Sequence, residues 1–187
     1  PYPHYLETHH TLKDGSAVLV RPSRPEDADM VQSFVRNLSD ESRYNRFMSS
    51  IKELSQSVLV RFTQLDYDRE MALVMVKARA DGTEETLGIA RYVTDPDMEV
   101  CEFATSVADE WQGHDIGTIL MNLLFDAARQ QGLKVMRGEI LTSNTGMHKL
   151  MKKLGFSIRK DPDDNSIYQV EKILQLPENA TEAIKSE

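Results

Sequence analysis

The stretch Val107 to Gln131, VADEWQGHDIGTILMNLLFDAARQQ, decides the fold of this chain. It runs from the apolar end of a strand through the glycine-bearing turn of residues 111–117 into a long amphipathic helix. The first amides of a helix have no intrahelical partners and lie at the positive end of its dipole, so they hold a pyrophosphate without any lysine or arginine. Glycine also lets the backbone approach a phosphate closely. The stretch therefore predicts an anion-binding turn between a strand and a helix.

Outward from this stretch, strand and helix patterns alternate along the chain. Apolar residues at three- and four-residue spacing after Pro25, Ser39 and Ser55 predict helices, and short apolar runs bounded by turn residues predict strands. The expected strands cover residues 17–20, 71–78, 84–93, 99–108, 135–141, 157–159 and 167–170, and a last helix covers 144–154. This order predicts an α/β fold in which a mixed sheet has helices on both faces.

The composition limits the partners of the chain. With 187 residues and a formal net charge of -8, it has the length of one domain and too few clustered basic residues for a general nucleic-acid role. No apolar run approaches the ~20 residues that span a bilayer, so no membrane insertion is expected. Cys101 is the only cysteine, and the histidines lack ligand spacing outside the pair His9-His10. We therefore expect a reducing, cytoplasmic setting and no metal site.

Three segments are expected along the chain. Residues 1–14 open with Pro1-Tyr2-Pro3-His4-Tyr5 and are expected to form a linker or an N-terminal extension. Residues 15–174 contain the alternating elements and are expected to form the domain. Residues 175–187 are expected to form a polar C-terminal tail.

The turn resembles motif A of the GNAT acetyltransferase superfamily, whose Gln/Arg-x-x-Gly-x-Gly/Ala signature holds the pyrophosphate of acetyl-CoA. The six positions are residues 112–117. The resemblance implies the GNAT fold, with a mixed, mostly antiparallel sheet of six or seven strands, and acetyl-CoA as cosubstrate. The cofactor-binding residues that it implies around this turn are Ser106, Val107, Gln112, Gly113, His114, Asp115, Ile116, Gly117 and Thr118.

The signature departs from the family at its fourth position, where Asp115 replaces the usual glycine. A carboxylate ~5 Å from a phosphate repels it by roughly 3 kcal/mol at an effective dielectric of ~20, if the side chain points at the anion. Aspartate is also among the best N-cap residues and tolerates a left-handed backbone, so an Asp115 that caps the helix would disturb the cofactor much less. Both interpretations stay open at the level of the sequence.

A second motif and several further phrases extend the resemblance. Asn144 to Phe156, NTGMHKLMKKLGF, resembles motif B, with an Asn at a helix start and Gly-Phe at its end, and places Asn144 near the pantetheine or the leaving sulfur. Other phrases resemble the GNAT domain of bacterial Pat-type protein lysine acetyltransferases, which modify acyl-CoA synthetases. These phrases are residues 21–28, 38–44, 46–48, 66–72 and 101–104. The resemblance implies a protein substrate with a reactive lysine, such as an acyl-CoA synthetase, and fusion to an acyl-CoA synthetase-like domain as in many Pat-type proteins.

Glu102 is the candidate general base. A lysine amine is mostly protonated at neutral pH and only its neutral form attacks a thioester, so a proton acceptor is needed nearby. Glu102 lies in an otherwise apolar strand, where burial would raise the pKa of a carboxyl group, and the Pat-type resemblance places the catalytic Glu here. A solvent-facing Glu on an alternating strand is the alternative. Glu70 and Glu99 are poorer candidates, and the tyrosine that many GNAT enzymes use to reprotonate the thiolate is Met151 here.

Three functions agree with these patterns. The first is an acetyl-CoA-dependent protein lysine acetyltransferase, which the Pat-type phrases favour. The second is a regulatory module in which Asp115 has weakened or abolished cofactor binding. The third is an enzyme that acetylates a small amine, a polyamine or an antibiotic. The net negative charge suits a lysine-bearing protein and a polyamine alike, so charge does not choose between them.

Overall fold

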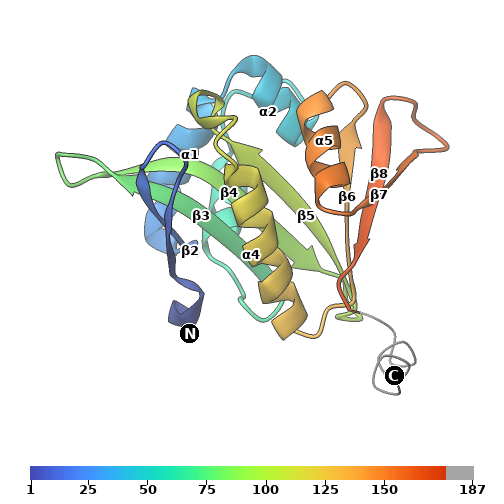
Figure 1. Cartoon of the computed structure of the whole chain (residues 1–187), viewed down its shortest axis with the longest axis horizontal. Coiled ribbons are helices and arrows are strands. Elements are labelled where there is room, and N and C mark those ends of the chain that lie inside the picture. The colour runs from blue at the N-terminus through green and yellow to red at the C-terminus, as the bar shows by residue number, and fades with distance from the viewer. Residues whose placement is uncertain (176–187) are drawn as a thin grey trace.

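One mixed sheet forms the frame of the chain (Figure 1). The computed structural model describes residues 1–175. The strands lie in the order β1-β2-β3-β4-β5-β6-β8-β7, and all neighbours are antiparallel except β5 and β6, which are parallel. Their bounds are β1 Thr8–Thr11, β2 Ala17–Pro22, β3 Glu70–Ala78, β4 Glu84–Thr94, β5 Val100–Val107, β6 Val135–Leu141, β7 Ser157–Lys160 and β8 Ile167–Ile173. The expected mixed, mostly antiparallel sheet is confirmed, with eight strands in place of six or seven.

Strand β1 is the edge strand that the sequence analysis missed. It lies inside residues 1–14, where we expected a linker or an N-terminal extension, and it pairs with β2 from Thr8↔Val20 to Thr11↔Ala17. Directly after it, Leu12 is 4% exposed and belongs to the main core. Backbone hydrogen bonds hold an edge strand without an apolar run, so the polar sequence THHT carried no strand signal. Residues 176–187, most of the expected polar tail, lie outside the described residues.

Helices cover both faces of the sheet, as predicted (Figure 1). A larger core lies between the sheet and helices α4 and α5, and a smaller one lies under α1 and α3 on the other face. Helices α2 and α3 begin directly after Ser39 and Ser55, as expected, and the Oγ atoms of these serines accept hydrogen bonds from backbone amides of the two helices. The bounds are α1 Ala28–Asn37, α2 Asp40–Phe47, α3 Gln56–Thr63, α4 Ile116–Gln130 and α5 Thr145–Lys153, with short 3-10 helices η1 His4–Leu6, η2 Pro25–Asp27 and η3 Asp109–Trp111.

Strands β5 and β6 diverge in the middle of the sheet. They pair only from Val100↔Val135 to Glu102↔Arg137. Just beyond, the ring of Phe103 lies against β6, where a Cβ on Gly138 would come within 2.7 Å of it. From there β6 stays paired with β8, whereas the rest of β5 has only β4 as a neighbour. The free edge of β5 leads directly to the motif A turn. The backbone N–H and C=O groups on this edge of β5 can form hydrogen bonds with another extended chain.

Candidate active site

A cavity of about 750 Å³ lies at the free end of β5. It is lined by the end of β5, the motif A turn, the starts of α4 and α5, and helix α2. Nine of the ten residues predicted to bind the cofactor line it, namely Ser106, Val107, Gln112, Gly113, Asp115, Ile116, Gly117, Thr118 and Asn144. The fold therefore brings the two motifs, which are separate in sequence, to one cavity.

The motif A turn has the backbone of an anion-binding turn. Gly113 and Asp115 adopt left-handed conformations, with φ angles of 84° and 63°, and α4 begins immediately afterwards at Ile116. The amides of the first turn of α4 have no intrahelical acceptors, and this turn lines the cavity. Gly117 allows α4 to approach α5, because a Cβ there would lie 3.1 Å from Cδ2 of Leu150. The turn thus presents helix amides to an anion in the cavity.

Two lysines hold the carboxylate of Asp115. Its Oδ2 lies 2.7 Å from Nζ of Lys13, and its Oδ1 lies 3.7 Å from Nζ of Lys153. The hydrogen bond from Lys13, joined by the charges of both lysines, lowers the pKa of Asp115. Asp115 does occupy the N-cap position of α4 with a left-handed backbone, as one interpretation expected, but within residues 1–175 its side chain accepts no hydrogen bond from a helix amide. Two ammonium groups instead balance the charge that was expected to repel phosphate.

His114 is the one predicted cofactor residue that does not line the cavity. Its Nδ1 lies 3.1 Å from the carbonyl oxygen of Trp111, and the centres of the two rings are 5.1 Å apart. Nε1 of Trp111 in turn donates a hydrogen bond of 3.0 Å to Glu85 of β4. These contacts brace the turn against the β3–β4 hairpin, which is a structural role for His114.

Asn144 caps helix α5 at the edge of the cavity. Its Oδ1 accepts a hydrogen bond of 3.2 Å from the amide of Met147. The cap uses only the oxygen, so the side-chain NH2 group keeps its two donors for a ligand. At the other end of motif B, the ring of Phe156 packs 5.3 Å from Phe103 and 5.8 Å from Phe125, which fixes α5 against the main core.

Glu102 lies on β5 but faces solvent. Its neighbours Cys101 and Phe103 are 0% and 9% exposed, whereas Glu102 is exposed. The predicted burial of Glu102 is therefore wrong, because strand alternation turns it to the opposite face, beside the exposed Val93 and Arg137. It is the last residue of β5 that pairs with β6, and it does not line the 750 Å³ cavity, whose lining on β5 begins at Thr105.

The two poorer candidates for the base have cationic partners. Oε2 of Glu70 lies 3.6 Å from Arg91, and Oε1 of Glu99 lies 3.2 Å from Nζ of Lys134. Glu70 therefore belongs to a polar network, since it also accepts a hydrogen bond from the amide of Asp66. Burial raises the pKa of Cys101 to about 12, so its thiol is not an available nucleophile at neutral pH.

Helix α2 supplies cavity residues that the sequence analysis missed. The residues of α2 that line the cavity are Glu41, Ser42, Asn45 and Arg46. Asp109 of η3 anchors α2 there, because it accepts hydrogen bonds from the Ser39 amide at 2.9 Å and from the Ser42 hydroxyl at 2.9 Å. Periodicity predicted the helix itself. No pattern among neighbouring residues indicates that α2 lies beside the motif A turn, which is far away in the sequence.

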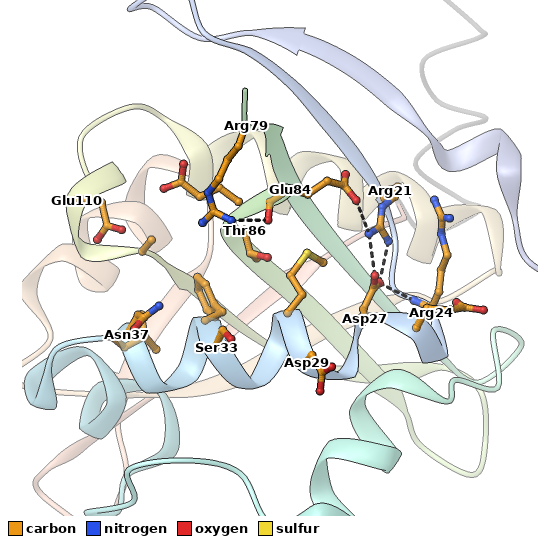
Figure 2. Close-up of a pocket in the computed structure, with 16 residues that line it drawn as sticks. Arg21, Arg24, Asp27, Asp29, Ser33, Asn37, Arg79, Glu84, Thr86 and Glu110 are labelled. Carbon is orange, nitrogen blue, oxygen red and sulfur yellow. Dashed lines mark hydrogen bonds and ion pairs between the residues drawn. The ribbon is translucent and has the colours of Figure 1, made fainter. Parts of the chain in front are cut away.

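A second cavity, of about 480 Å³, lies on the flank of α1 (Figure 2). Ser33 and Asn37 of α1 line it together with Thr86 of β4 and the buried Arg21 of β2. Thr86 is 9% exposed, and its Oγ1 has no hydrogen-bond partner within residues 1–175. None of the predicted cofactor residues lines this cavity, and it shares no lining residue with the first.

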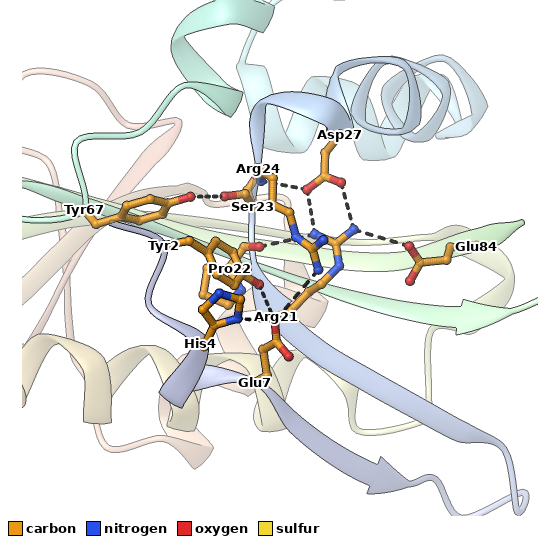
Figure 3. Close-up of polar contacts among 10 residues, drawn as sticks. All are labelled: Tyr2, His4, Glu7, Arg21, Pro22, Ser23, Arg24, Asp27, Tyr67 and Glu84. Atoms are coloured by element: carbon orange, nitrogen blue, oxygen red, sulfur yellow. Dashed lines mark hydrogen bonds and ion pairs between the residues drawn. The ribbon is translucent and has the colours of Figure 1, made fainter.

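A buried ion pair fixes the corner between β2 and α1 (Figure 3). The guanidinium of Arg21, which is 3% exposed, donates two hydrogen bonds of 2.8 Å to the carboxylate of Asp27. Asp27 also accepts a bond of 2.8 Å from the amide of Arg24. Nearby, the hydroxyl of Tyr67 donates to the carbonyl of Ser23 at 2.6 Å. These bonds hold the start of α1 against the sheet.

The described part of the chain offers neither a metal cluster nor a membrane helix. Among residues 1–175, no group of three or more His, Cys, Asp or Glu side chains is placed to hold a metal ion. No helix in the same range is long and apolar enough to cross a bilayer.

Comparison with known proteins agrees with this geometry. A model of the acetyltransferase (GNAT) family matches residues 34–156. The chain belongs to the GNAT family. Acetyltransferase PA5475 of Pseudomonas aeruginosa is 36% identical to this GNAT chain over 163 residues, which cover 87% of the chain and 86% of that protein.

Pat-type proteins are among its relatives. Acetyltransferase Pat of Mycolicibacterium smegmatis is 30% identical over 149 residues, which cover 77% of this chain and 42% of that protein. The crystal structure of the GNAT domain of S. lividans PAT superposes with a TM-score of 0.83 at 26% identity, covering 92% of this chain and 99% of that one. The GNAT fold and the similarity to Pat-type domains are therefore confirmed. Enzymes of the GNAT family use acetyl-CoA as the acetyl donor.

Proposed function

We propose that this chain transfers the acetyl group of acetyl-CoA to the side-chain amine of a lysine in a protein. The observation that carries the proposal is the cavity at the free end of β5, where the motif A turn, the start of α4 and Asn144 meet. Membership of the GNAT family supports the acetyl donor, and the similarity to Pat-type domains supports a protein acceptor. By that resemblance, the acceptor is an acyl-CoA synthetase.

The proposed binding mode gives acetyl-CoA one direction in the cavity. Its pyrophosphate accepts hydrogen bonds from the amides of residues 112–118 at the start of α4. Its pantetheine arm lies along the free edge of β5 at Ser106 and Val107, where β6 no longer pairs. The thioester then lies towards the point at which β5 and β6 diverge, and the amide group of Asn144 lies near the sulfur.

Glu102 is the proposed general base. The neutral lysine nitrogen attacks the thioester carbonyl carbon, a C–N bond forms, the C–S bond breaks, and CoA leaves as the thiolate. Glu102 takes the proton of the attacking amine and returns it to water, to which its carboxylate is exposed. Its position at the last pair of β5 and β6 supports this role, because the free edge of β5 begins there.

Replacement of Glu102 by Gln tests this role. The variant keeps the shape of the side chain and removes the base, so turnover should fall by ~10²-fold or more while the affinity for acetyl-CoA changes little. Glu99→Gln is the matched control, since Glu99 is an exposed carboxylate just before β5 that pairs with Lys134, and its turnover should stay near wild type. Unchanged turnover of Glu102→Gln at neutral pH would assign the proton to another group or to water.

Calorimetry with acetyl-CoA tests the proposal as a whole. One molecule should bind per chain, and hydrolysis-resistant analogues should compete with it. The regulatory-module alternative predicts weakened binding or no heat of binding. Its ground was the charge of Asp115, and Lys13 and Lys153 balance that charge. A polyamine acetyltransferase would show turnover with spermidine and none with lysine-bearing proteins.

The cellular location and the domain context of the enzyme are also part of the proposal. We propose a cytoplasmic location, because the single cysteine is buried and no disulfide can form within the chain. Fusion to an acyl-CoA synthetase-like domain is part of the proposal and rests on the resemblance alone. Measurement of the activity on acyl-CoA synthetases with and without flanking sequence would test the need for such a domain.

A further inference from the structure

Arg46, near the end of α2, lines the cofactor cavity without an acidic partner. Its guanidinium carbon lies 4.6 Å from the ring centre of Phe47 and 5.9 Å from that of Phe62. Within residues 1–175 no carboxylate lies within ion-pair distance of it, whereas the two fully buried arginines, Arg21 and Arg43, each bind an aspartate. A half-buried guanidinium without a carboxylate is costly, because aromatic rings replace only part of its hydration.

Arg91 makes the surroundings of Arg46 more positive. Its guanidinium carbon lies 4.0 Å from the ring centre of Phe62, and Glu70 is its only ion-pair partner in the described range. The two guanidinium groups therefore share the ring of Phe62, and only Arg91 has a carboxylate partner. Burial, with the charge of Arg91 second, lowers the pKa of Arg46 to about 10, so Arg46 stays charged at neutral pH. This cluster is positive although the chain as a whole carries a net charge of -8.

The cluster lies beside the part of β5 where acetyl transfer is proposed. Arg46 also lines a narrow pocket on the α1–α3 side of the sheet, together with Ala104 and Ser106. Ser106 lines this pocket and the cofactor cavity alike. These positions follow the divergence of β5 from β6, where the proposed function locates the thioester. An acceptor that enters from the α2 side therefore passes Arg46.

We propose that Arg46 binds a carboxylate that the acceptor carries close to its reactive amine. The proposal rests on the proposed function and adds the substrate class, namely a lysine with an Asp or Glu side chain nearby in the acceptor protein. Planar guanidinium groups bind carboxylates with two parallel hydrogen bonds, and no side chain among residues 1–175 uses the donors of Arg46. The α-carboxylate of a free amino acid would supply the same chemistry, and the test separates the two sources.

Paired peptides give the test. Each peptide contains one lysine, and the members of a pair differ only in Asp against Asn at positions flanking that lysine. The wild-type chain should acetylate the Asp peptide with a kcat/KM about ten- to a hundredfold higher than the Asn peptide, as expected for a charge-assisted bond. Free lysine and lysine amide form the second pair, which differs only in the α-carboxylate. If only this pair shows a difference in kcat/KM, the carboxylate that Arg46 binds is that of a free amino acid.

Variants of Arg46 show whether this residue causes the preference. Arg46→Met keeps an unbranched chain between Phe47 and Phe62, and the Asp-to-Asn ratio should fall to about one whatever the absolute rate. Arg46→Lys keeps a point charge and should keep part of the ratio. Arg36→Gln is the matched control, because Arg36 pairs with Glu53 on the surface at 2.7 Å and lines neither pocket, so the ratio should stay at the wild-type value. Thermal melting checks that each variant is folded.

Peptide binding in the presence of CoA, measured by calorimetry, separates failure of the inference from failure of the proposed function. If acetyl-CoA binds and peptides are acetylated without an Asp preference, the inference on Arg46 is wrong and the proposed function stands. An equal loss for both peptides in Arg46→Met would give Arg46 a role in packing or on the thioester oxygen, and would also overturn it. If no peptide is acetylated but the Asp peptide still binds about tenfold more tightly through Arg46, the proposed function fails and the inference on the carboxylate site stands.

Discussion

At the scale of single residues, Asp115 shows how distant side chains neutralise a departure from a motif. Its left-handed backbone fits the place of a glycine, and its carboxylate meets Lys13 and Lys153. We therefore expect Asp115→Gly to change the dissociation constant of acetyl-CoA by less than about fivefold, since exposed ion pairs contribute little net free energy. Calorimetry measures this change, and thermal melting reports any change in the turn. An increase in affinity by one or two powers of ten would mean that the carboxylate faces the phosphate.

Removal of the two lysines makes a sharper test of the same residue. Lys13→Met together with Lys153→Met leaves the carboxylate of Asp115 unbalanced beside the phosphate-binding amides, so the affinity for acetyl-CoA should fall by about tenfold at low salt. Addition of Asp115→Asn should restore most of this loss. If it restores nothing, the lysines bind the cofactor directly instead of balancing Asp115.

At the scale of elements, one carboxylate joins α2 to the motif A side of the cavity. Asp109 accepts three hydrogen bonds, from the amide and hydroxyl of Ser39 and the hydroxyl of Ser42. Asp109→Ala should lower the free energy of unfolding by about 1 to 3 kcal/mol, which urea denaturation measures. Glu110→Ala is the control, because Glu110 is the exposed neighbour of Asp109 and its replacement should cause no such loss. An unchanged stability of Asp109→Ala would show that packing alone places α2.

The pH dependence of this anchor has a defined sign. Burial raises the pKa of Asp109, but the bonds from Ser39 and Ser42 outweigh it and hold the pKa below its ordinary value. Because the pKa of Asp109 is lower in the folded state, its ionised carboxylate contributes to the free energy of unfolding above the unfolded-state pKa of about 3.9. This contribution is lost as the pH falls through the folded-state pKa. The stability difference between wild type and Asp109→Ala should therefore be constant near pH 7 and shrink below about pH 4.

Elements with local signals were predictable, and contacts between distant segments were not. Neighbouring residues determine where a helix starts and which of its faces is apolar. Helices α2, α3 and α4 therefore begin where we expected. Glu102 shows the limit, because alternation with Cys101 and Phe103 was visible, yet which face the helices cover depends on the whole fold. The contact between Lys13 and Asp115 joins residues so far apart that no spacing rule reaches it. Site residues on one motif were therefore predictable, and their partners were not.

At the scale of the whole molecule, helix α1 lines both the second cavity and the narrow pocket beside β5. Phe34 and Leu38 of α1 line the second cavity and also the narrow pocket beside β5. The start of α1 is held by the buried pair of Arg21 and Asp27 (Figure 3). The ion pair therefore adds to the apolar packing that places this helix, and with it the acceptor side of the proposed active site, although the pair lines only the second cavity.

Loss of one member of this pair should be costly and loss of both much less so. Asp27→Ala leaves the buried guanidinium of Arg21 with only the more distant Glu84, at 3.5 Å, as an acidic partner, so the free energy of unfolding should fall by about 3 kcal/mol. The double variant Arg21→Met, Asp27→Leu removes both charges and should recover most of that loss. Urea denaturation compares the three proteins, and the affinity for acetyl-CoA should be the same in each while it is folded, because the pair lines only the second cavity. A double variant as unstable as Asp27→Ala would show that the bond from the Arg24 amide to Asp27 holds the corner instead of the ion pair.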